Sequence, residues 1–143
     1  MKLYATFFVI VILFLSQEAR AQDQVVVIGS GGGFSGAVTA YKITSKGEVL
    51  KGSGVVEIKY TECAKIKKST AKKIIDNTSR EALLVKEFNH PGNMYSFLSI
   101  ENGKEQTRLT WGDNNTPAPE KIRQLHADIL KTVGSLRYKP IKK

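Results

Sequence analysis

Cysteine is almost absent from this sequence of 143 residues, since Cys63 is the only one. No disulfide can therefore form within the chain, and the fold must be stabilised by packing alone. Cys63 itself has two interpretations, a reactive thiol or a small buried apolar side chain. We expect the second, because free cysteine is among the residue types most often found in protein interiors.

Histidine and recognisable catalytic motifs are also scarce. His90 and His126 are the only two histidines, and neither has a second ligand-type residue at helical or hairpin spacing, so we predict no metal site. His126 lies beside Leu125 and is expected at the boundary of the core. No Gly-x-Ser-x-Gly motif and no Cys–His pairing are present, and the carboxylates are scattered. We therefore predict that the protein is not an enzyme and has no cofactor.

Long apolar runs are limited to one, from Leu3 to Leu15. It is too short for an ordinary membrane-spanning helix, and Ala19-Arg20-Ala21 after it fits a signal peptidase site. We predict a signal peptide over residues 1–21, cleaved near Ala21, and a secreted or periplasmic protein with no transmembrane segment in the mature chain. The alternative is an uncleaved membrane anchor.

The remaining 122 residues suit a single domain over residues 22–136, followed by a basic, flexible tail over residues 137–143. The whole chain carries +9, of which the signal contributes +1, leaving +8. Such a charge favours anionic partners such as an envelope polymer or lipid headgroups. Secretion and a lack of neighbouring aromatic residues argue against nucleic acid as a partner.

The densest basic patch comprises Lys65, Lys67, Lys68, Lys72 and Lys73. Its alternative interpretation is a solvated helix face.

The first half of the domain has the β-branched, alternating pattern of strands. Strands are predicted over 25–28, 37–44 and 48–51, with a turn at residues 45–48. We expect Gly52-Ser53-Gly54 to interrupt the third strand, and strand character to resume over 55–60. A helix then begins at Ser69 as N-cap, with an apolar stripe and a break near Asn77. The stripe comprises Ala71, Ile74, Ile75 and Thr78.

The second half predicts a hairpin and a helix. Residues 94–100 and 106–111 flank Asn102-Gly103, a pair typical of a type I′ turn. Pro119 suits a helix start and Gly134 a helix end. The apolar face between them comprises Ile122, Leu125, Ile129 and Val133, with Leu130 beside it. The predicted fold class is α+β, a single domain with a mostly antiparallel sheet and two helices packed on one face.

The segment VVVIGSGGGFSG, residues 25–36, superficially matches a dinucleotide-binding loop. Such a loop must open a helix whose amides hold the pyrophosphate, but residues 37–44 have the pattern of a strand, and the glycine spacing does not fit. We therefore interpret the glycines as a tight bend between two strands. Phe34 on this bend is expected either to fold onto the core or to project outward, burial being the more ordinary arrangement.

The stretch Gly32-Gly33-Phe34-Ser35-Gly36 after a first strand resembles the start of the emfourin family, small proteinaceous inhibitors of thermolysin-like metalloproteases. The order of elements over residues 25–134 is also similar, including Pro91 before a hairpin arm that carries Tyr95. The secretion signal, the segment 52–68 and the basic tail depart from the family pattern. The resemblance implies inhibition by a loop that occludes the protease cleft. The implied binding residues are Gly32, Gly33, Phe34, Ser35 and Gly36, followed by Asn89 and Pro91 in the loop 89–93.

Three functional hypotheses follow from the sequence. The first is a secreted, non-enzymatic binding protein that inhibits an extracellular metalloprotease. The second is a cell-envelope module that binds anionic polymer or lipid through its basic face. The third, the least favoured, is a nucleotide-binding oxidoreductase that uses the glycine loop.

Overall fold

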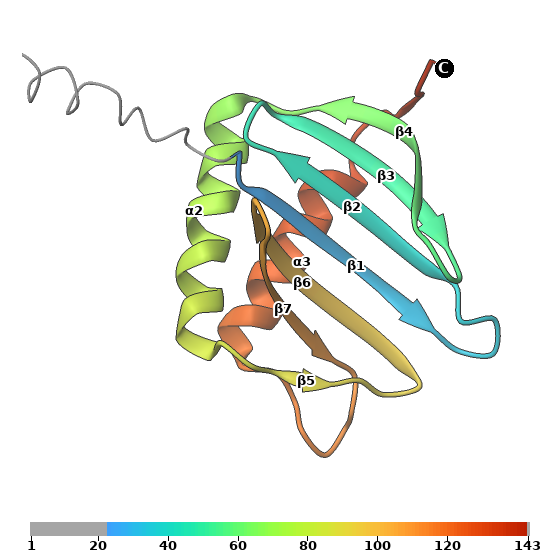
Figure 1. The fold of residues 1–143 in the computed structure, drawn as a ribbon, viewed down its shortest axis with the longest axis vertical. Helices are drawn as coiled ribbons and strands as arrows, with labels where there is room; N and C mark the ends of the chain where they lie inside the picture. The colour runs from blue at the N-terminus through green and yellow to red at the C-terminus, as the bar shows by residue number, and fades with distance from the viewer. Residues whose placement is uncertain (1–22, 143) are drawn as a thin grey trace, which may run out of the picture.

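A largely antiparallel eight-stranded sheet carries two helices on one of its faces in the computed structural model, which describes residues 23–142 (Figure 1). The order across the sheet is β5-β7-β6-β1-β2-β3-β4-β8, and only β5 and β7 run parallel. The predicted α+β class is confirmed. The predicted signal peptide and its cleavage site lie outside the described residues. The strands are β1 (Val25–Gly32), β2 (Val38–Thr44), β3 (Glu48–Gly54), β4 (Lys59–Lys65), β5 (Asn89–His90), β6 (Met94–Asn102), β7 (Glu105–Trp111) and β8 (Lys139–Pro140).

The first strand lies in the middle of the sheet, between β2 and β6. Because successive strand residues point to opposite faces, Val26 and Ile28 face the helices and are fully buried. Val27 faces the other way and joins Ala40 and Phe97 in a second, smaller apolar cluster. The sheet therefore has one face packed on helices and one face open, whose small cluster is covered by its own side chains.

Helix α2 (Lys68–Val85) packs its predicted apolar stripe on the sheet. Ala71, Ile74, Ile75 and Thr78 are buried as predicted. The predicted start and break are wrong. Lys67 occupies the N-cap position without a side-chain cap, and the helix continues unbroken through Asn77. The burial of Ala82 in the core explains the continuity, because it anchors the second half of the helix to the sheet.

Helix α3 (Glu120–Gly134) packs against the same face of the sheet. Ile122, Ile129 and Val133 are buried, while Leu125 is half-buried, and the predicted end at Gly134 is confirmed. The prediction for His126 is wrong, because its side chain is buried rather than at the boundary of the core. Its position one residue after Leu125 turns it toward β1, where it meets a backbone carbonyl.

Strand β3 does not stop at Gly52-Ser53-Gly54, as the sequence had suggested. Gly52 pairs with Tyr60 in the ladder, and a Cβ added there would lie 2.6 Å from the carbonyl oxygen of Lys59. The glycines thus permit close approach of β4 instead of interrupting β3. The turn falls at residues 55–58, in the segment predicted to be strand.

The turn between β6 and β7 is shifted by one residue from the prediction. Asn102 pairs with Glu105, so Gly103 and Lys104 are the two central residues. Gly103 has φ of 62°, whereas Lys104 does not lie in the positive-φ region. A type I′ turn needs positive φ at both positions, so this hairpin has the pattern of a type II′ turn.

The C-terminal tail was expected to be flexible, and this is wrong for residues 138–141. Strand β8 pairs with Glu62 and Cys63 of β4, and the amide of Ile141 donates to the carbonyl of Thr61 at 2.9 Å. The Tyr138 hydroxyl donates to the Val133 carbonyl at 2.8 Å. Burial, together with Tyr41 and Glu62, raises the pKa of Tyr138 to about 12. The tail therefore covers part of the β4 edge.

Candidate functional site

The glycine-rich segment joins two antiparallel strands, β1 and β2. The chain that leaves it is the strand Val38–Thr44, so the bend does not open a helix. The pyrophosphate site of a dinucleotide-binding fold depends on such a helix. The geometry on which the oxidoreductase hypothesis depended is therefore not present at this loop.

The bend itself depends on three glycines with left-handed backbone. Gly32, Gly33 and Gly36 have φ of 103°, 71° and 62°, values that residues with a Cβ rarely adopt. The Gly36 amide donates to the Gly33 carbonyl at 3.2 Å, and the Ala37 amide donates to the Ser35 hydroxyl at 3.3 Å. These bonds hold Gly33–Ala37 as a short, internally bonded loop.

Phe34 lies at the tip of this loop with a relative exposure of 111%. The expectation that it would fold onto the core is wrong. Gly33 and Gly36, on either side, have left-handed backbone and form the bend, and the full exposure of Phe34 means that its ring is not packed on the core. A fully exposed phenylalanine on a hydrogen-bonded bend is unfavourable for a free molecule in water, and it is suited to insertion into an apolar pocket.

Only part of the second predicted loop, residues 89–93, lies beside the glycine bend. The Gly33 amide donates to the Asn93 carbonyl at 2.8 Å, which fixes the end of residues 91–93 against the bend. Pro91 is exposed in this loop. Asn89, by contrast, belongs to β5 and pairs with Thr110 of β7. Two strands, β7 and β6, separate it from β1 and the bend.

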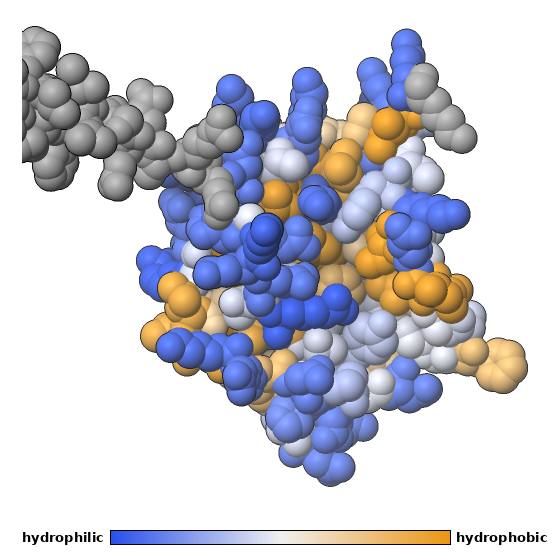
Figure 2. Space-filling model, in the orientation of Figure 1, coloured by the Kyte–Doolittle hydropathy of each residue, from blue (hydrophilic) through white to orange (hydrophobic). Residues whose placement is uncertain are grey.

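A third segment, the β3–β4 turn, lies beside the bend and was not predicted as part of a site. A Cβ added at Gly36 would lie 3.7 Å from a methyl carbon of Val55, and one added at Gly33 would lie 3.2 Å from the sulfur of Met94. Val55, Val56 and Met94 are 65%, 100% and 61% exposed. Figure 2 shows apolar side chains gathered at this end of the sheet. We call the four residues the apolar edge: Phe34, Val55, Val56 and Met94.

Sequence reasoning missed three of the four residues of the apolar edge for one reason. Val55-Val56 has the composition of a strand, and Met94 begins one. The signal that could have found the two valines is their position directly after Gly52-Ser53-Gly54, which also permits a hairpin that ends there. Composition alone does not distinguish an apolar strand from an apolar turn.

The five lysines of the predicted basic patch are all exposed, and none forms an ion pair with a described residue. Lys65 ends β4, whereas Lys72 and Lys73 lie in the first turns of α2. Lys68 and Lys72 line a shallow cavity of about 620 Å³ that also contains Asp23 and Asp76. The patch is at the opposite end of β4 from the Val55–Val56 turn, so it is separate from the apolar edge.

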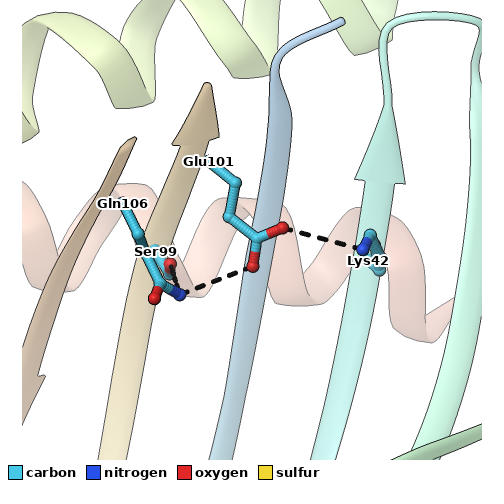
Figure 3. A network of polar contacts seen from close by, with 4 residues as sticks. All are labelled: Lys42, Ser99, Glu101 and Gln106. Carbon is cyan, nitrogen blue, oxygen red and sulfur yellow. Dashed lines mark hydrogen bonds and ion pairs between the residues drawn. The ribbon is translucent and has the colours of Figure 1, made fainter. Parts of the chain in front are cut away.

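A polar network lies on the open face of the sheet (Figure 3). Lys42 and Glu101 form an ion pair at 3.6 Å across β1, and the amide nitrogen of Gln106 donates to the Ser99 hydroxyl at 3.0 Å. Beside it, the Arg108 guanidinium lies 4.0 Å from the centre of the Phe97 ring, which is 1% exposed. Burial, with the nearby Glu101, raises the pKa of Tyr60 on this face. These side chains shield the small apolar cluster from water.

His126 contributes to packing at the centre of the fold. Its Nε2 lies 3.3 Å from the Gly29 carbonyl oxygen, and its ring meets the edge of Trp111 with centroids 5.0 Å apart. Burial lowers the pKa of His126, and the bond to Gly29 offsets this only in part. Within residues 23–142, no three His, Cys, Asp or Glu side chains are grouped so that they could hold a metal ion.

Cys63 is only half-buried, so the expectation of a fully buried thiol is not met. It lines a cavity of about 520 Å³ with Leu50 and Ile141.

Neither α2 nor α3 has the length and apolarity needed to cross a membrane. A scan of protein-family models gives no match to this chain, and a search of curated proteins gives none either.

Proposed function

We propose that this protein binds another protein through the apolar edge and thereby inhibits an extracellular metalloprotease of the thermolysin-like kind. The observation that carries the proposal is the complete exposure of Phe34 at the tip of a bend held by hydrogen bonds. A loop held in one conformation loses little entropy on binding. An aromatic side chain that enters a pocket also supplies much of the binding energy of a protein interface.

The surroundings of Phe34 support insertion into a cleft. Val55, Val56 and Met94 present further apolar surface beside the bend, so the contact extends over two loops and the start of β6. Such an arrangement gives an anchor side chain with apolar neighbours that exclude water from it. The class of protease is taken from the resemblance of Gly32–Gly36 to the emfourin family, whose targets accept apolar side chains.

The proposal is tested by titrating the purified protein, residues 22–143, against thermolysin with a peptide substrate. We expect inhibition at micromolar concentration or below. Phe34→Ala should weaken it at least about 30-fold, because losing a buried aromatic anchor costs about 2 kcal/mol or more. Leu84→Ala is the matched control, since Leu84 is also well exposed but lies on α2. It should leave inhibition unchanged.

Two outcomes would contradict the proposal. One is no inhibition by the wild-type protein at about 100 μM. The other is inhibition that Phe34→Ala leaves intact, which would place the contact elsewhere on the molecule. Unchanged thermal unfolding of both variants should accompany the titration, so that a loss of inhibition is not confused with a loss of fold.

A second candidate function uses the basic patch to bind an anionic envelope polymer or lipid. The observation that favours it is the exposure of five lysines at one end of β4 and the start of α2, none of them in an ion pair with a described residue. We expect binding to phosphatidylglycerol vesicles that weakens steeply as NaCl rises from about 20 to 300 mM, because screening shortens the range of surface charges. Replacing the five lysines by glutamine should abolish it, and salt-independent binding in a cosedimentation assay would reject it.

A further inference from the structure

Most of strand β7 has an uncovered edge. On its inner side β7 pairs with β6 over its whole length, from Glu105 to Trp111. On its outer side, β5 pairs only with Thr110 and Trp111. No described strand pairs with Glu105–Leu109 on that side. An uncovered strand edge offers backbone hydrogen-bonding groups to another chain.

The hydrogen bonds show which groups point to this edge. The Thr110 amide donates outward, to the Phe88 carbonyl at 2.8 Å. In an antiparallel ladder the bonding direction repeats every second residue, so the amide and carbonyl groups of Arg108 and Gln106 also point outward. Both residues are exposed. Two donors and two acceptors are therefore available along the free edge.

A groove runs along this edge, between β7 and α2. Two cavities of about 790 and 200 Å³ share Ala82, Leu83 and Thr107 in their linings. Leu83 is 63% exposed, although it projects from a helix whose other apolar residues are mostly buried. The groove thus combines backbone groups with an unpartnered apolar side chain.

The charges in this groove are balanced, in contrast to those of the whole chain. Its charged lining residues are two bases, Lys86 and Arg108, and two acids, Glu87 and Glu105. The full sequence carries +9. Two copies that met through most other surfaces would repel each other, whereas two copies of this groove present equal numbers of opposite charges.

We infer that the protein forms a homodimer with twofold symmetry in which the β7 strands of two copies pair antiparallel. Centred on Thr107, this pairing lets Gln106 of one copy and Arg108 of the other exchange two backbone hydrogen bonds. The twofold axis repeats the exchange, so the interface contains four. Leu83 of each copy is covered at the same time. Strand β6 separates β7 from β1, and Met94 lies six residues along β6 from Ile100, the partner of Thr107. The apolar edge therefore stays free, and the inference does not depend on the proposed function.

Sedimentation equilibrium of the purified protein, residues 22–143, tests the inference at about 5 to 500 μM. We expect the mass to approach twice that of the monomer as concentration rises. Gln106→Pro removes one outward amide and leaves the ladder to β6 intact, so it should weaken dimerisation at least tenfold. Gln106→Ala is the matched control, because it also loses the side-chain bond to Ser99 but keeps the amide.

Leu83→Asp provides a second test that leaves the strand unaltered. Each copy would then bury a carboxylate in the covered groove, so this variant should be monomeric across the same range. Val56→Asp, on the apolar edge, should dimerise like the wild type. A wild-type protein that is monomeric at 500 μM overturns the inference, as does a dimer that persists in Leu83→Asp. If Gln106→Pro fails to fold, as judged by circular dichroism, Leu83→Asp decides.

Discussion

His126 has surroundings that differ from what its sequence position indicates. Its ring is 7% exposed, and it is held between the Trp111 ring and the Gly29 carbonyl. Since burial lowers its pKa, the folded protein keeps the imidazole neutral at pH values where the unfolded chain takes up a proton. The stability that this neutral side chain provides is present above the unfolded pKa of about 6.5 and is lost as the pH falls below it.

We therefore expect the free energy of unfolding to decrease between pH 6.5 and 5, by up to about 1.4 kcal/mol per pH unit from this one group. The measurement is urea denaturation across that range, comparing slopes instead of absolute stabilities. His126→Gln should flatten the dependence. His90→Gln, at an exposed site, should leave it unchanged. An equally steep dependence in His126→Gln would show that another group is responsible.

Phe34 shows the limit of sequence reasoning at the residue scale. The glycines around it correctly predicted a bend, because three of them adopt a left-handed backbone that residues with a Cβ rarely adopt. They did not determine where the side chain would point, since that depends on whether the chain leaves the sheet before or after Phe34. Burial of a single apolar residue is set by its neighbours in space, which local sequence does not specify.

At the scale of elements, the bend between β1 and β2 is a tightly constrained piece of backbone. Gly32 combines a φ of 103° with close contact to the Asn93 carbonyl, so a Cβ there meets both strain and a clash. We expect Gly32→Ala to lower the free energy of unfolding by about 2 kcal/mol or more, since left-handed backbone alone costs about 1–2 kcal/mol. Urea denaturation measures this directly.

Gly134→Ala is the control for that substitution. It lies at the end of α3, where an added Cβ would meet nothing within 4 Å, and its φ is not in the left-handed region. Because alanine favours helix over glycine, this variant should be as stable as the wild type or slightly more stable. Equal losses at both positions would mean that the bend is not the constrained site described here.

Most elements were predictable from the sequence, whereas most of their ends were not. The two helices and the two clearest hairpins follow from periodicity and turn residues, because these patterns are local. The errors occurred where tertiary contact decides, as in the continuation of β3 through Gly52 and the docking of residues 138–141. A glycine can end a strand or allow a neighbouring strand to approach closely, and a basic tail can be free or paired with a strand. Which of these occurs depends on a segment distant in the sequence.

At the scale of the whole molecule, the sequence predicted the fold class but not the order of strands. The apolar edge exists only because that order places Met94 beside Gly32 and the β3–β4 turn beside Gly36. These segments are separated in the sequence by tens of residues, and a single sequence contains no local signal that they meet. The basic patch, in contrast, was found from the sequence because its five residues are close together in the chain.

A prediction at this scale concerns a fragment that ends at Asn93. It retains β1 to β4 and α2 but lacks β6, β7 and α3, so one edge of β1 and much of the core are left uncovered. We expect this fragment to lack a cooperative thermal transition, as monitored by circular dichroism, whereas residues 22–143 should unfold in one step. A cooperative transition in the fragment would identify an independent folding unit within the first half.

The central position of β1 also bears on how the chain reaches its native state. The first described strand to be synthesised needs a neighbour on each side, and residues 33–93 separate it from the second of these, β6. Closing so long a loop is entropically costly, which slows folding dominated by such distant pairings. In a nascent chain, Val25–Ile28, its most apolar strand, therefore has only β2 to pair with until about two-thirds of the sequence has been synthesised. During this interval the other edge of the strand is uncovered, and the protein is most prone to aggregation.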